Sequence, residues 1–307
     1  MRIAFVFPGQ TSHRAGAVAP WQGHPAAAVL DDVARGSGRD LATLVDDPAA
    51  PQRTADAQPA VLAASLVAWR ALVAVGVHPD VVAGHSLGEV TAAIAAGVLS
   101  VRDGAALAAA RGDAMTAVCE RGTGGMAAVL RLGPDAVEVI VDGIDDAVIA
   151  NDDAPGQIVV AGPPPALRQL REVVRFAGGR VVPLAAEGAF HSPAMAGAAP
   201  NLAATLARLR LRDPRVPIVS GATATPLRTA SDVADALVEG LGAPVRWREV
   251  QARLVELRVT DLVEVGPGGV LAGLAIRAMP EVTVHRVGTP DDVQRVADAL
   301  APLRVAV

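Results

Sequence analysis

A serine flanked by two glycines is the first feature of this sequence that could do chemistry. The stretch Gly84–Gly88 reads G-H-S-L-G, after an apolar segment expected to form a strand at Asp80–Gly84 and before a small-residue helix at Glu89–Gly97. A strand, G-x-S-x-G and a helix are typical of a nucleophile elbow, a turn so sharp that the serine stands exposed at the helix N-terminus. We therefore predict that Ser86 attacks a carbonyl in acyl transfer or acyl hydrolysis, with the N–H of Leu87 facing the oxyanion. The competing interpretation is a serine that only shapes a turn.

Such a serine needs a general base, and His191 is the best-placed histidine. It follows the last strand of a predicted subdomain, in the run G-A-F-H-S-P, where the chain returns to the larger domain just before a helix. A histidine at that crossing could face the elbow across a cleft and accept the Ser86 proton, although it could also cap the helix or pack. No acidic residue stands out as a third member, so a backbone carbonyl could orient the ring instead. The other histidines are expected to pack, shape turns or lie in loops: His13, His24, His78, His85 and His285.

Composition narrows the class of protein. Hydrophobic residues make up 51% of the 307 residues, charged residues 19%, and the net charge is −5, so neither nucleic acid nor a membrane is a predicted partner. The single cysteine, Cys119, excludes internal disulfides and a cysteine-based zinc site and suits a reducing compartment. No leader pattern is evident and no apolar run approaches the ~20 residues that span a bilayer. We expect a soluble, cytoplasmic and monomeric protein that uses no metal or redox cofactor.

The outer parts of the chain alternate short apolar strands with helices. This order predicts an α/β fold: a hydrolase-like, mostly parallel sheet with helices on both faces. The expected strands are Ile3–Phe7, Asp80–Gly84, Pro217–Ser220, Asp261–Glu264 and Thr283–Val287. The expected helices include Pro59–Val75, Val101–Val118, Pro193–Ala207 and Arg246–Leu257.

The middle of the chain follows a different order. Its expected strands are Gly125–Leu130, Ala147–Ala150, Gln157–Ala161 and Arg180–Leu184, and its expected helices are Pro134–Val141 and Pro164–Ala177. The order β-α-β-β-α-β is that of a ferredoxin-like unit. We expect such a subdomain at residues 123–186, inserted into a large domain formed by residues 1–122 and 187–307.

Seven short motifs together resemble one enzyme family. They are Phe7–Gln10 (F-P-G-Q), Ala57–Ala60 (A-Q-P-A), Gly84–Glu89 (G-H-S-L-G-E), Arg111–Met115 (R-G-x-x-M), Gly188–Pro193 (G-A-F-H-S-P), Pro244–Trp247 (P-V-R-W) and Glu264–Gly268 (E-V-G-P-G). In this order and spacing the chain resembles the malonyl-CoA:acyl-carrier-protein transacylases, a group that includes the acyltransferase domains of polyketide synthases. The likeness covers about residues 2 to 290 and is strongest to freestanding actinobacterial enzymes. That family also carries an inserted ferredoxin-like unit.

The resemblance implies a role for each matching residue. Ser86 would be the nucleophile and His191 the general base and acid, held by a main-chain carbonyl near Gly240. The N–H groups of Gln10 and Leu87 would form the oxyanion hole. Where the family usually has glycine this chain has Thr11, so either the loop is rebuilt or that glycine is not required.

The same resemblance implies how the acyl group is held. Gln58 would line the acyl pocket, Asn151 would brace the active-site loop, and Arg111 would pair with the free carboxylate of a malonyl group. A guanidinium suits that role because it stays charged and grips a carboxylate through two parallel hydrogen bonds. Leu87 and Phe190 match the malonyl-selective pattern, since a bulky Phe190 would crowd an α-methyl group.

The implied reaction takes malonyl-CoA as donor and the phosphopantetheine thiol of a small acidic carrier protein as acceptor, for fatty-acid or polyketide synthesis. Basic residues of the subdomain could meet that carrier or simply form a solvated surface: Arg168, Arg171, Arg175 and Arg180. Two other functions stay open, an editing hydrolase of acyl carrier proteins with the same fold and a non-catalytic docking module. A buried cation at Arg111 would argue against the hydrolase, and an intact Ser86 and His191 against the docking module.

Overall fold

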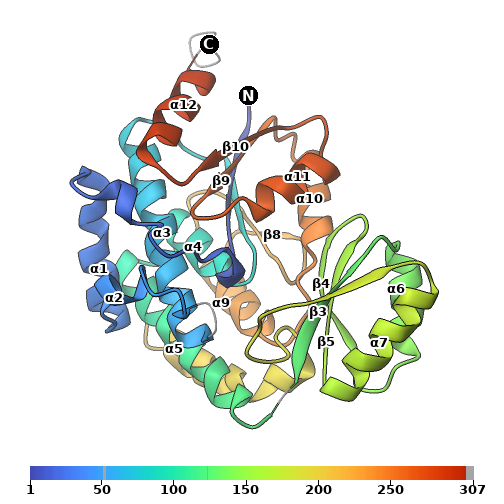
Figure 1. The fold of residues 1–307 in the computed structure, drawn as a ribbon. Coiled ribbons are helices and arrows are strands. Elements are labelled where there is room, and N and C mark those ends of the chain that lie inside the picture. Colours follow the sequence, from blue (N-terminus) through green and yellow to red (C-terminus); the bar gives the residue numbers. More distant parts are fainter. Residues whose placement is uncertain (51–52, 123, 302–307) are drawn as a thin grey trace.

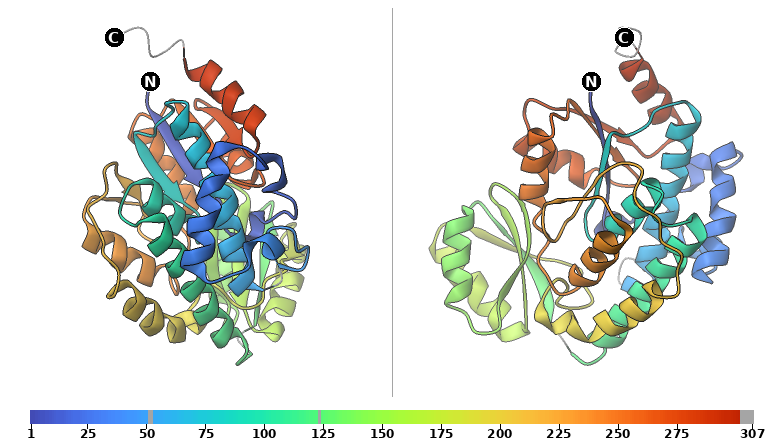
Figure 2. Two further views of the ribbon diagram at one scale, coloured as in Figure 1. Left: turned by 90° about the vertical axis from the view of Figure 1, so that its left-hand side faces the viewer. Right: turned by 180° about the vertical axis from the view of Figure 1, so that it is seen from behind.

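The computed structural model describes residues 1–50, 53–122 and 124–301, which form two sheets and their covering helices. In Figure 1 the smaller sheet, with helices α6 (Pro134–Asp142) and α7 (Pro164–Phe176), lies at one side of the larger unit. Strand β1 (Ile3–Phe7) and helix α12 (Pro290–Leu300) lie near the same end of the molecule, as the views in Figure 2 show.

The larger sheet is mostly parallel, as the sequence predicts. Its strand order is β10 (Thr283–Val287), β9 (Asp261–Val265), β1, β2 (Val81–Gly84), β7 (Ile218–Val219) and β8 (Pro226–Leu227). Neighbouring strands pair in parallel except β7 and β8, a short antiparallel pair that the sequence analysis misses. Phe7 and Gly84 pair at the carboxyl ends of β1 and β2, so the loops that follow these two strands begin side by side. Open parallel sheets bind their ligands at this edge.

Helices cover both faces of this sheet. Alternate strand residues point to opposite sides, so Ile3, Phe5 and Phe7 join one core while Ala4 and Val6 join another. The first core includes side chains of α1 (Val29–Ser37), α2 (Leu41–Leu44), α3 (Thr54–Ala74), α4 (Gly88–Ala95), α5 (Val101–Cys119), α8 (Ala199–Leu206), α9 (Ala230–Glu239) and α12. The second core lies under α10 (Trp247–Glu256) and α11 (Val270–Ala278). Short 3₁₀ turns complete the unit: η1 (Gln10–Ser12), η2 (Ala19–Trp21), η3 (Pro25–Ala28) and η5 (Pro193–Ala198).

One predicted helix is wrong over its first half. The sequence predicts a continuous helix over Pro193–Ala207, whereas Pro193–Ala198 is a 3₁₀ turn and α8 begins only at Ala199. Pro200 explains the break, because proline lacks the N–H that a continuous helix needs at that position and is tolerated only in the first turn.

The smaller sheet has the predicted ferredoxin-like order. Its strands run β4 (Val148–Ala154), β5 (Gln157–Gly162), β3 (Gly125–Leu130) and β6 (Arg180–Pro183), and every pair is antiparallel. Helix α6 connects β3 to β4 and α7 connects β5 to β6, which confirms the β-α-β-β-α-β order. The boundaries at 123 and 186 stay a prediction, and residue 123 lies outside the described residues.

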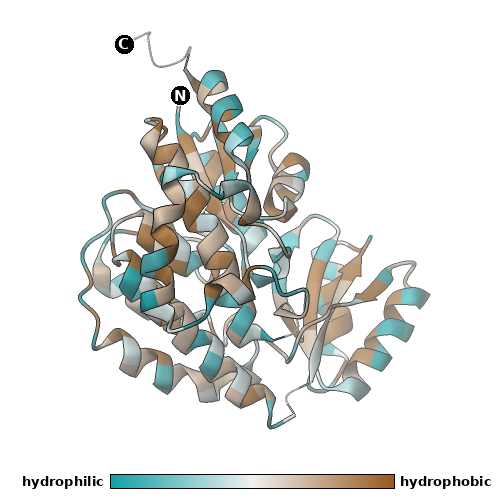
Figure 3. Cartoon of the chain, turned by 60° about the vertical axis from the view of Figure 1, so that its left-hand side comes forward, coloured by the Kyte–Doolittle hydropathy of each residue, from teal (hydrophilic) through white to brown (hydrophobic). Residues whose placement is uncertain are grey.

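Both faces of the smaller sheet are covered. Val129, Ile158 and Val160 pack with α6 and α7, whereas Met126 and Val159 belong to the core of the larger unit. Figure 3 shows hydrophobic residues along the strands and hydrophilic residues on the outer helices. The inserted unit therefore shares a core with the domain that carries it.

Hydrogen bonds also join β4 to the segment before α10 and to the first turn of α10. Asp152 N–H donates to the Val245 carbonyl at 2.9 Å, and Val245 N–H donates to the Ala150 carbonyl at 2.8 Å. The Arg248 guanidinium grips the Asp152 carboxylate through Nε at 3.0 Å and Nη2 at 2.7 Å. These contacts fix the small sheet beside the carboxyl-terminal edge of the larger sheet, where Ser86 lies.

Helix α3 is the one described helix that is long and apolar enough, by length and composition, to cross a membrane. Of its most apolar window, 78% is buried inside the molecule. Its residues pack into the main core of the larger unit.

Candidate active site

Ser86 occupies the predicted elbow between β2 and α4. Its φ of 55° lies in the left-handed region, which non-glycine residues rarely adopt and which often marks functional sites. The flanking glycines are required by space: a Cβ on Gly84 would lie 1.9 Å from the Gly88 carbonyl carbon, and one on Gly88 would lie 2.0 Å from the Phe7 oxygen. The elbow is thus a close approach of three backbone segments that holds Ser86 at the start of a helix.

His191 meets Ser86 as predicted from its position in the chain. Its Nε2 lies 2.8 Å from Ser86 Oγ, and its Nδ1 lies 2.8 Å from the carbonyl oxygen of Gly240 at the end of α9. A carbonyl only accepts, so Nδ1 carries the proton, and Nε2 is free to accept the proton of the Ser86 hydroxyl. The main-chain carbonyl takes the orienting place that an acidic side chain has in other triads.

The surroundings of His191 keep its ring neutral. Burial, together with the charges of Arg111 and His85, lowers its pKa to about 3, against the raising effect of the Gly240 carbonyl. An anion bound at Arg111 would remove part of this repulsion, so His191 would accept a proton more readily with an anionic substrate in place.

Arg111 points at the nucleophile from α5. The side chain is 3% exposed; its Nη2 donates to Ser86 Oγ at 3.2 Å and its Nη1 to Gln58 Oε1 at 2.9 Å. Burial lowers its pKa to about 10, so the guanidinium remains charged at neutral pH. The structure thus places a buried cation within reach of an acyl group on Ser86.

A chain of hydrogen bonds that the sequence analysis misses connects Arg111 to the loop after β1. Gln58 Nε2 donates to Thr54 Oγ1 at 2.9 Å, and Thr54 Oγ1 donates to Gln10 Oε1 at 2.5 Å. Glu187 accepts from the Thr54 N–H at 2.8 Å, which fixes the start of α3. Thr54 and Glu187 belong to none of the motifs, and only their position in the fold brings them here.

The two predicted oxyanion donors come from the turn after β1 and from the elbow itself. Gln10 begins η1, the turn after β1, and Leu87 immediately precedes α4 with its side chain buried. Thr11 lies inside η1 and is absent from the residues of positive φ, so its backbone is not strained and glycine is not required there. The oxyanion role of the two N–H groups remains a prediction.

A cavity of about 270 Å³ opens onto Ser86 and contains several of the predicted site residues. It is lined by Gly9, Gln10, Thr11, His85, Ser86, Met126, Asn151, Leu184, Ala185, Ala186, Phe190 and His191. Asn151 forms a backbone bridge with Val245, which suits the predicted bracing role, and its buried Oδ1 has no hydrogen-bond partner among the described residues. The cavity is therefore lined by the loops that follow β1 and β2 and by strands β3 and β4 of the small sheet.

Other candidates lie elsewhere. His13 is buried and does not line this cavity. Neither do the four subdomain arginines, which are exposed on α7 and β6: Arg168, Arg171, Arg175 and Arg180. His85 turns away from Ser86 toward the small sheet, where its Nε2 lies 3.0 Å from Asp153 Oδ1 and its ring packs edge-on against Trp247.

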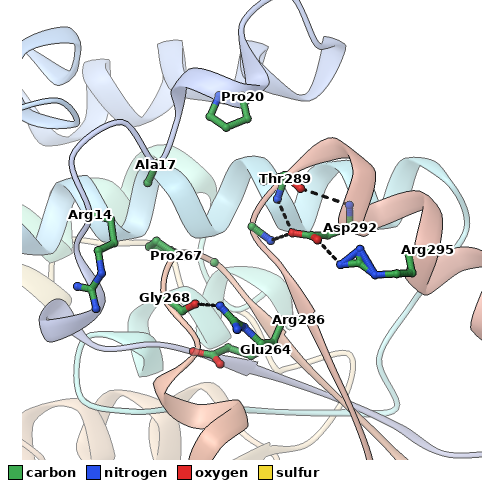
Figure 4. A pocket seen from close by; sticks show the side chains of 12 residues that line it. Arg14, Ala17, Pro20, Glu264, Pro267, Gly268, Arg286, Thr289, Asp292 and Arg295 are labelled. Atoms are coloured by element: carbon green, nitrogen blue, oxygen red, sulfur yellow. Dashed lines mark hydrogen bonds and ion pairs between the residues drawn. The ribbon is translucent and has the colours of Figure 1, made fainter.

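A second cavity of about 410 Å³ is rich in arginine but shares no lining residue with the cavity at Ser86. Figure 4 shows Arg14, Arg286 and Arg295 around it, together with Glu264. Each guanidinium already has a partner: the His13 carbonyl for Arg14, the Gly268 carbonyl for Arg286 and Asp292 for Arg295. These groups hold loops together and offer no nucleophile, so we assign the chemistry to Ser86.

Comparison with known proteins agrees with this geometry. The family model described as acyl transferase domain matches residues 4–299, and the chain therefore belongs to that family. The malonyl CoA-acyl carrier protein transacylase of Mycobacterium tuberculosis is 39% identical over 306 residues, covering 96% of this chain and 99% of that one.

Solved structures of the same class share the whole fold. An acyl-carrier-protein S-malonyltransferase from Burkholderia pseudomallei superposes with a TM-score of 0.93 at 33% identity, covering 97% of this chain and 100% of the other. A malonyl-transacylase in complex with a type II PKS acyl-carrier protein superposes with a TM-score of 0.91 at 31% identity, over 97% and 100% of the two chains. The predicted fold and the predicted family are both confirmed.

Proposed function

We propose that this protein is a malonyltransferase that moves a malonyl group from coenzyme A to the phosphopantetheine thiol of an acyl carrier protein. The observation that carries the proposal is the buried Arg111 guanidinium beside the Ser86–His191 pair. Among the described residues this guanidinium hydrogen-bonds to Gln58 and Ser86 and to no carboxylate, so its N–H groups are available to bind the free carboxylate of malonate. The relatives named above support the same donor and acceptor.

The mechanism follows from the distances around Ser86. Ser86 Oγ attacks the thioester carbonyl while its proton passes to Nε2 of His191, 2.8 Å away. The N–H groups of Gln10 and Leu87 stabilise the oxyanion. Collapse of the intermediate breaks the carbon–sulfur bond, and the departing thiolate takes the proton from His191, which leaves malonyl-Ser86.

The second half-reaction repeats these steps with the carrier thiol as nucleophile. Its proton passes to His191, the thiolate attacks the ester, and Ser86 regains the proton as it leaves. No step needs a metal or a redox cofactor, and we propose that the protein works without either, as a monomer in the cytoplasm. Whether the malonyl group enters fatty-acid or polyketide synthesis is set by the carrier protein that accepts it.

Intact-mass measurement tests the covalent step. Wild-type protein incubated with malonyl-CoA should gain one malonyl group, and Ser86→Ala should gain none, because the substitution removes one oxygen and leaves the core untouched. Ser100→Ala, which removes the serine that caps α5, is the matched control and should still be loaded. A malonylated Ser86→Ala protein would refute the assignment of the nucleophile.

Adding a phosphopantetheinylated carrier protein separates the transferase from the editing hydrolase. A transferase moves the mass of the malonyl group from Ser86 to the carrier, whereas a hydrolase releases free malonate at the same rate with or without carrier.

A further inference from the structure

A second buried charge lies behind the candidate active site. Glu89 follows Ser86 by three residues, in the first turn of α4, and is 7% exposed. Its Oε1 accepts the Gly221 N–H at 2.7 Å. Its Oε2 lies 3.3 Å from the place that a Cβ on Gly240 would occupy, so the carboxylate packs against the residue whose carbonyl orients His191.

Glu89 and Arg111 interact through their charges. The hydrogen bonds of the Arg111 guanidinium go to Gln58 and Ser86, and neither of these is a carboxylate. Burial raises the pKa of Glu89 to about 7, with the Gly221 N–H and the charge of Arg111 acting in the opposite direction. The other charged groups that act on Glu89 are His85 from the elbow, which lowers its pKa, and Glu239 from α9, which raises it.

We propose that Glu89 is the counter-charge of Arg111 and takes up a proton when an acyl group with a free carboxylate binds. The inference rests on the proposed malonyl transfer and deepens it by naming what balances the charge of the substrate. Without substrate, one cation and one anion are buried together. A malonyl carboxylate would leave one negative charge in excess, and a proton from solvent on a Glu89 oxygen removes that excess.

An acetyl group is uncharged, so its binding requires no proton uptake by Glu89. The Glu89 carboxylate hydrogen-bonds to the Gly221 N–H, whereas Arg111 donates to Ser86 Oγ, so Glu89 is a positioning residue that acts through Arg111. Its protonation should therefore change the KM for malonyl-CoA far more than kcat. As pH rises through the pKa of Glu89, malonyl binding should weaken, because the proton becomes harder to supply, while acetyl binding should not change.

The decisive measurement is the ratio of kcat/KM for malonyl-CoA to that for acetyl-CoA, followed from pH 6 to pH 8.5. The coenzyme is common to both substrates, so its own ionisation cancels in the ratio. His191 stays neutral throughout, since its pKa of about 3 lies below this range. In the wild type the ratio should fall about five- to tenfold, which corresponds to a pKa shift of about one unit on binding. In Glu89→Gln, which can still accept the Gly221 N–H, it should change less than about twofold.

Glu264→Gln is the matched control. Glu264 is also a buried carboxylate that accepts backbone N–H groups, from Leu271 at 3.3 Å and Ala272 at 2.8 Å, and burial raises its pKa. It lies at the cavity of Figure 4 and faces Arg286, not Arg111. Its substitution should leave the pH dependence of the ratio as in the wild type.

A second readout does not depend on turnover. Calorimetric titration of malonyl-CoA into Ser86→Ala, in two buffers of different ionisation enthalpy, should report proton uptake near pH 7, and the Ser86→Ala/Glu89→Gln double variant should report none. A pH-independent ratio in the wild type, or a ratio that keeps its pH dependence in Glu89→Gln, overturns the inference about Glu89. A wild-type protein that takes no malonyl group at all overturns the proposed function instead.

Discussion

At the scale of single residues, acyl selectivity depends on Arg111. Its guanidinium contacts Ser86 and Gln58 and is buried, so a substrate carboxylate would give it a charged hydrogen-bond partner in place of neutral ones. Hydrogen bonds to charged groups contribute ~1.5–3 kcal/mol each, and a neutral acyl group makes none of them.

Arg111→Ala should therefore lose malonyl loading while acetyl loading is retained or improved. The ratio of kcat/KM for malonyl-CoA over acetyl-CoA should fall by more than about tenfold, equivalent to ~1.4 kcal/mol. Arg102→Ala removes an exposed arginine from the same helix and should leave the ratio unchanged. A smaller fall of this ratio in Arg111→Ala would show that Arg111 does not select the malonyl group, and it would favour the editing hydrolase.

At the scale of elements, the site depends on how closely α4 approaches β1 and β2. Gly88, the first residue of α4, lies against the Phe7 carbonyl, where the rigid backbone leaves no room for a Cβ. Gly273 in α11 is exposed and has nothing within 4 Å of its hypothetical Cβ.

Substitution by alanine should consequently have opposite effects on the free energy of unfolding at Gly88 and at Gly273. Gly88→Ala should lower the free energy of unfolding by about 2 kcal/mol or more, because the helix must move away from the sheet, and Ser86 with it. Gly273→Ala should raise it by about 0.5–1 kcal/mol, since alanine restricts the unfolded chain and favours the helix. Urea unfolding measures both, and a Gly88→Ala protein as stable as the wild type would contradict the close packing of the elbow.

At the scale of the whole molecule, two buried groups of the site make stability depend on pH in opposite directions. His191 has its pKa lowered from 6.5 to about 3, so the folded state loses stability as pH falls through that window. Glu89 has its pKa raised from 4.5 to about 7, so the stability it contributes is present below pH 4.5 and is lost as pH rises toward 7. His191 thus lowers stability at acidic pH, and Glu89 lowers it at neutral and alkaline pH.

Glu89→Gln should accordingly stabilise the protein at alkaline pH. Its free energy of unfolding should exceed that of the wild type by roughly 1–3 kcal/mol at pH 8, and the difference should disappear below about pH 4.5. Denaturant unfolding at the two pH values measures this, and an equal difference at both would mean that the pKa of Glu89 is the same in the folded and unfolded states.

The sequence by itself determined the elements and the reacting groups. Strands such as Ile3–Phe7 and Gly125–Leu130 were predicted with their observed bounds, because short apolar runs between turn residues suit buried strands. Ser86, His191 and Arg111 could be chosen because each lies in a motif whose chemistry depends on the side chain, and the structure brings the three together.

Only the tertiary structure decided what holds these groups in place. The carbonyl of Gly240 orients His191, and the family resemblance pointed to this place, but no side chain of the sequence marks it because every residue has a carbonyl. Thr54, Glu187 and Glu89 reach their partners across 44, 133 and 132 residues of chain, distances over which local patterns carry no information. The second face of the small sheet, buried in the main core, was likewise set by docking, because a strand's sequence specifies an apolar face but not the surface that covers it.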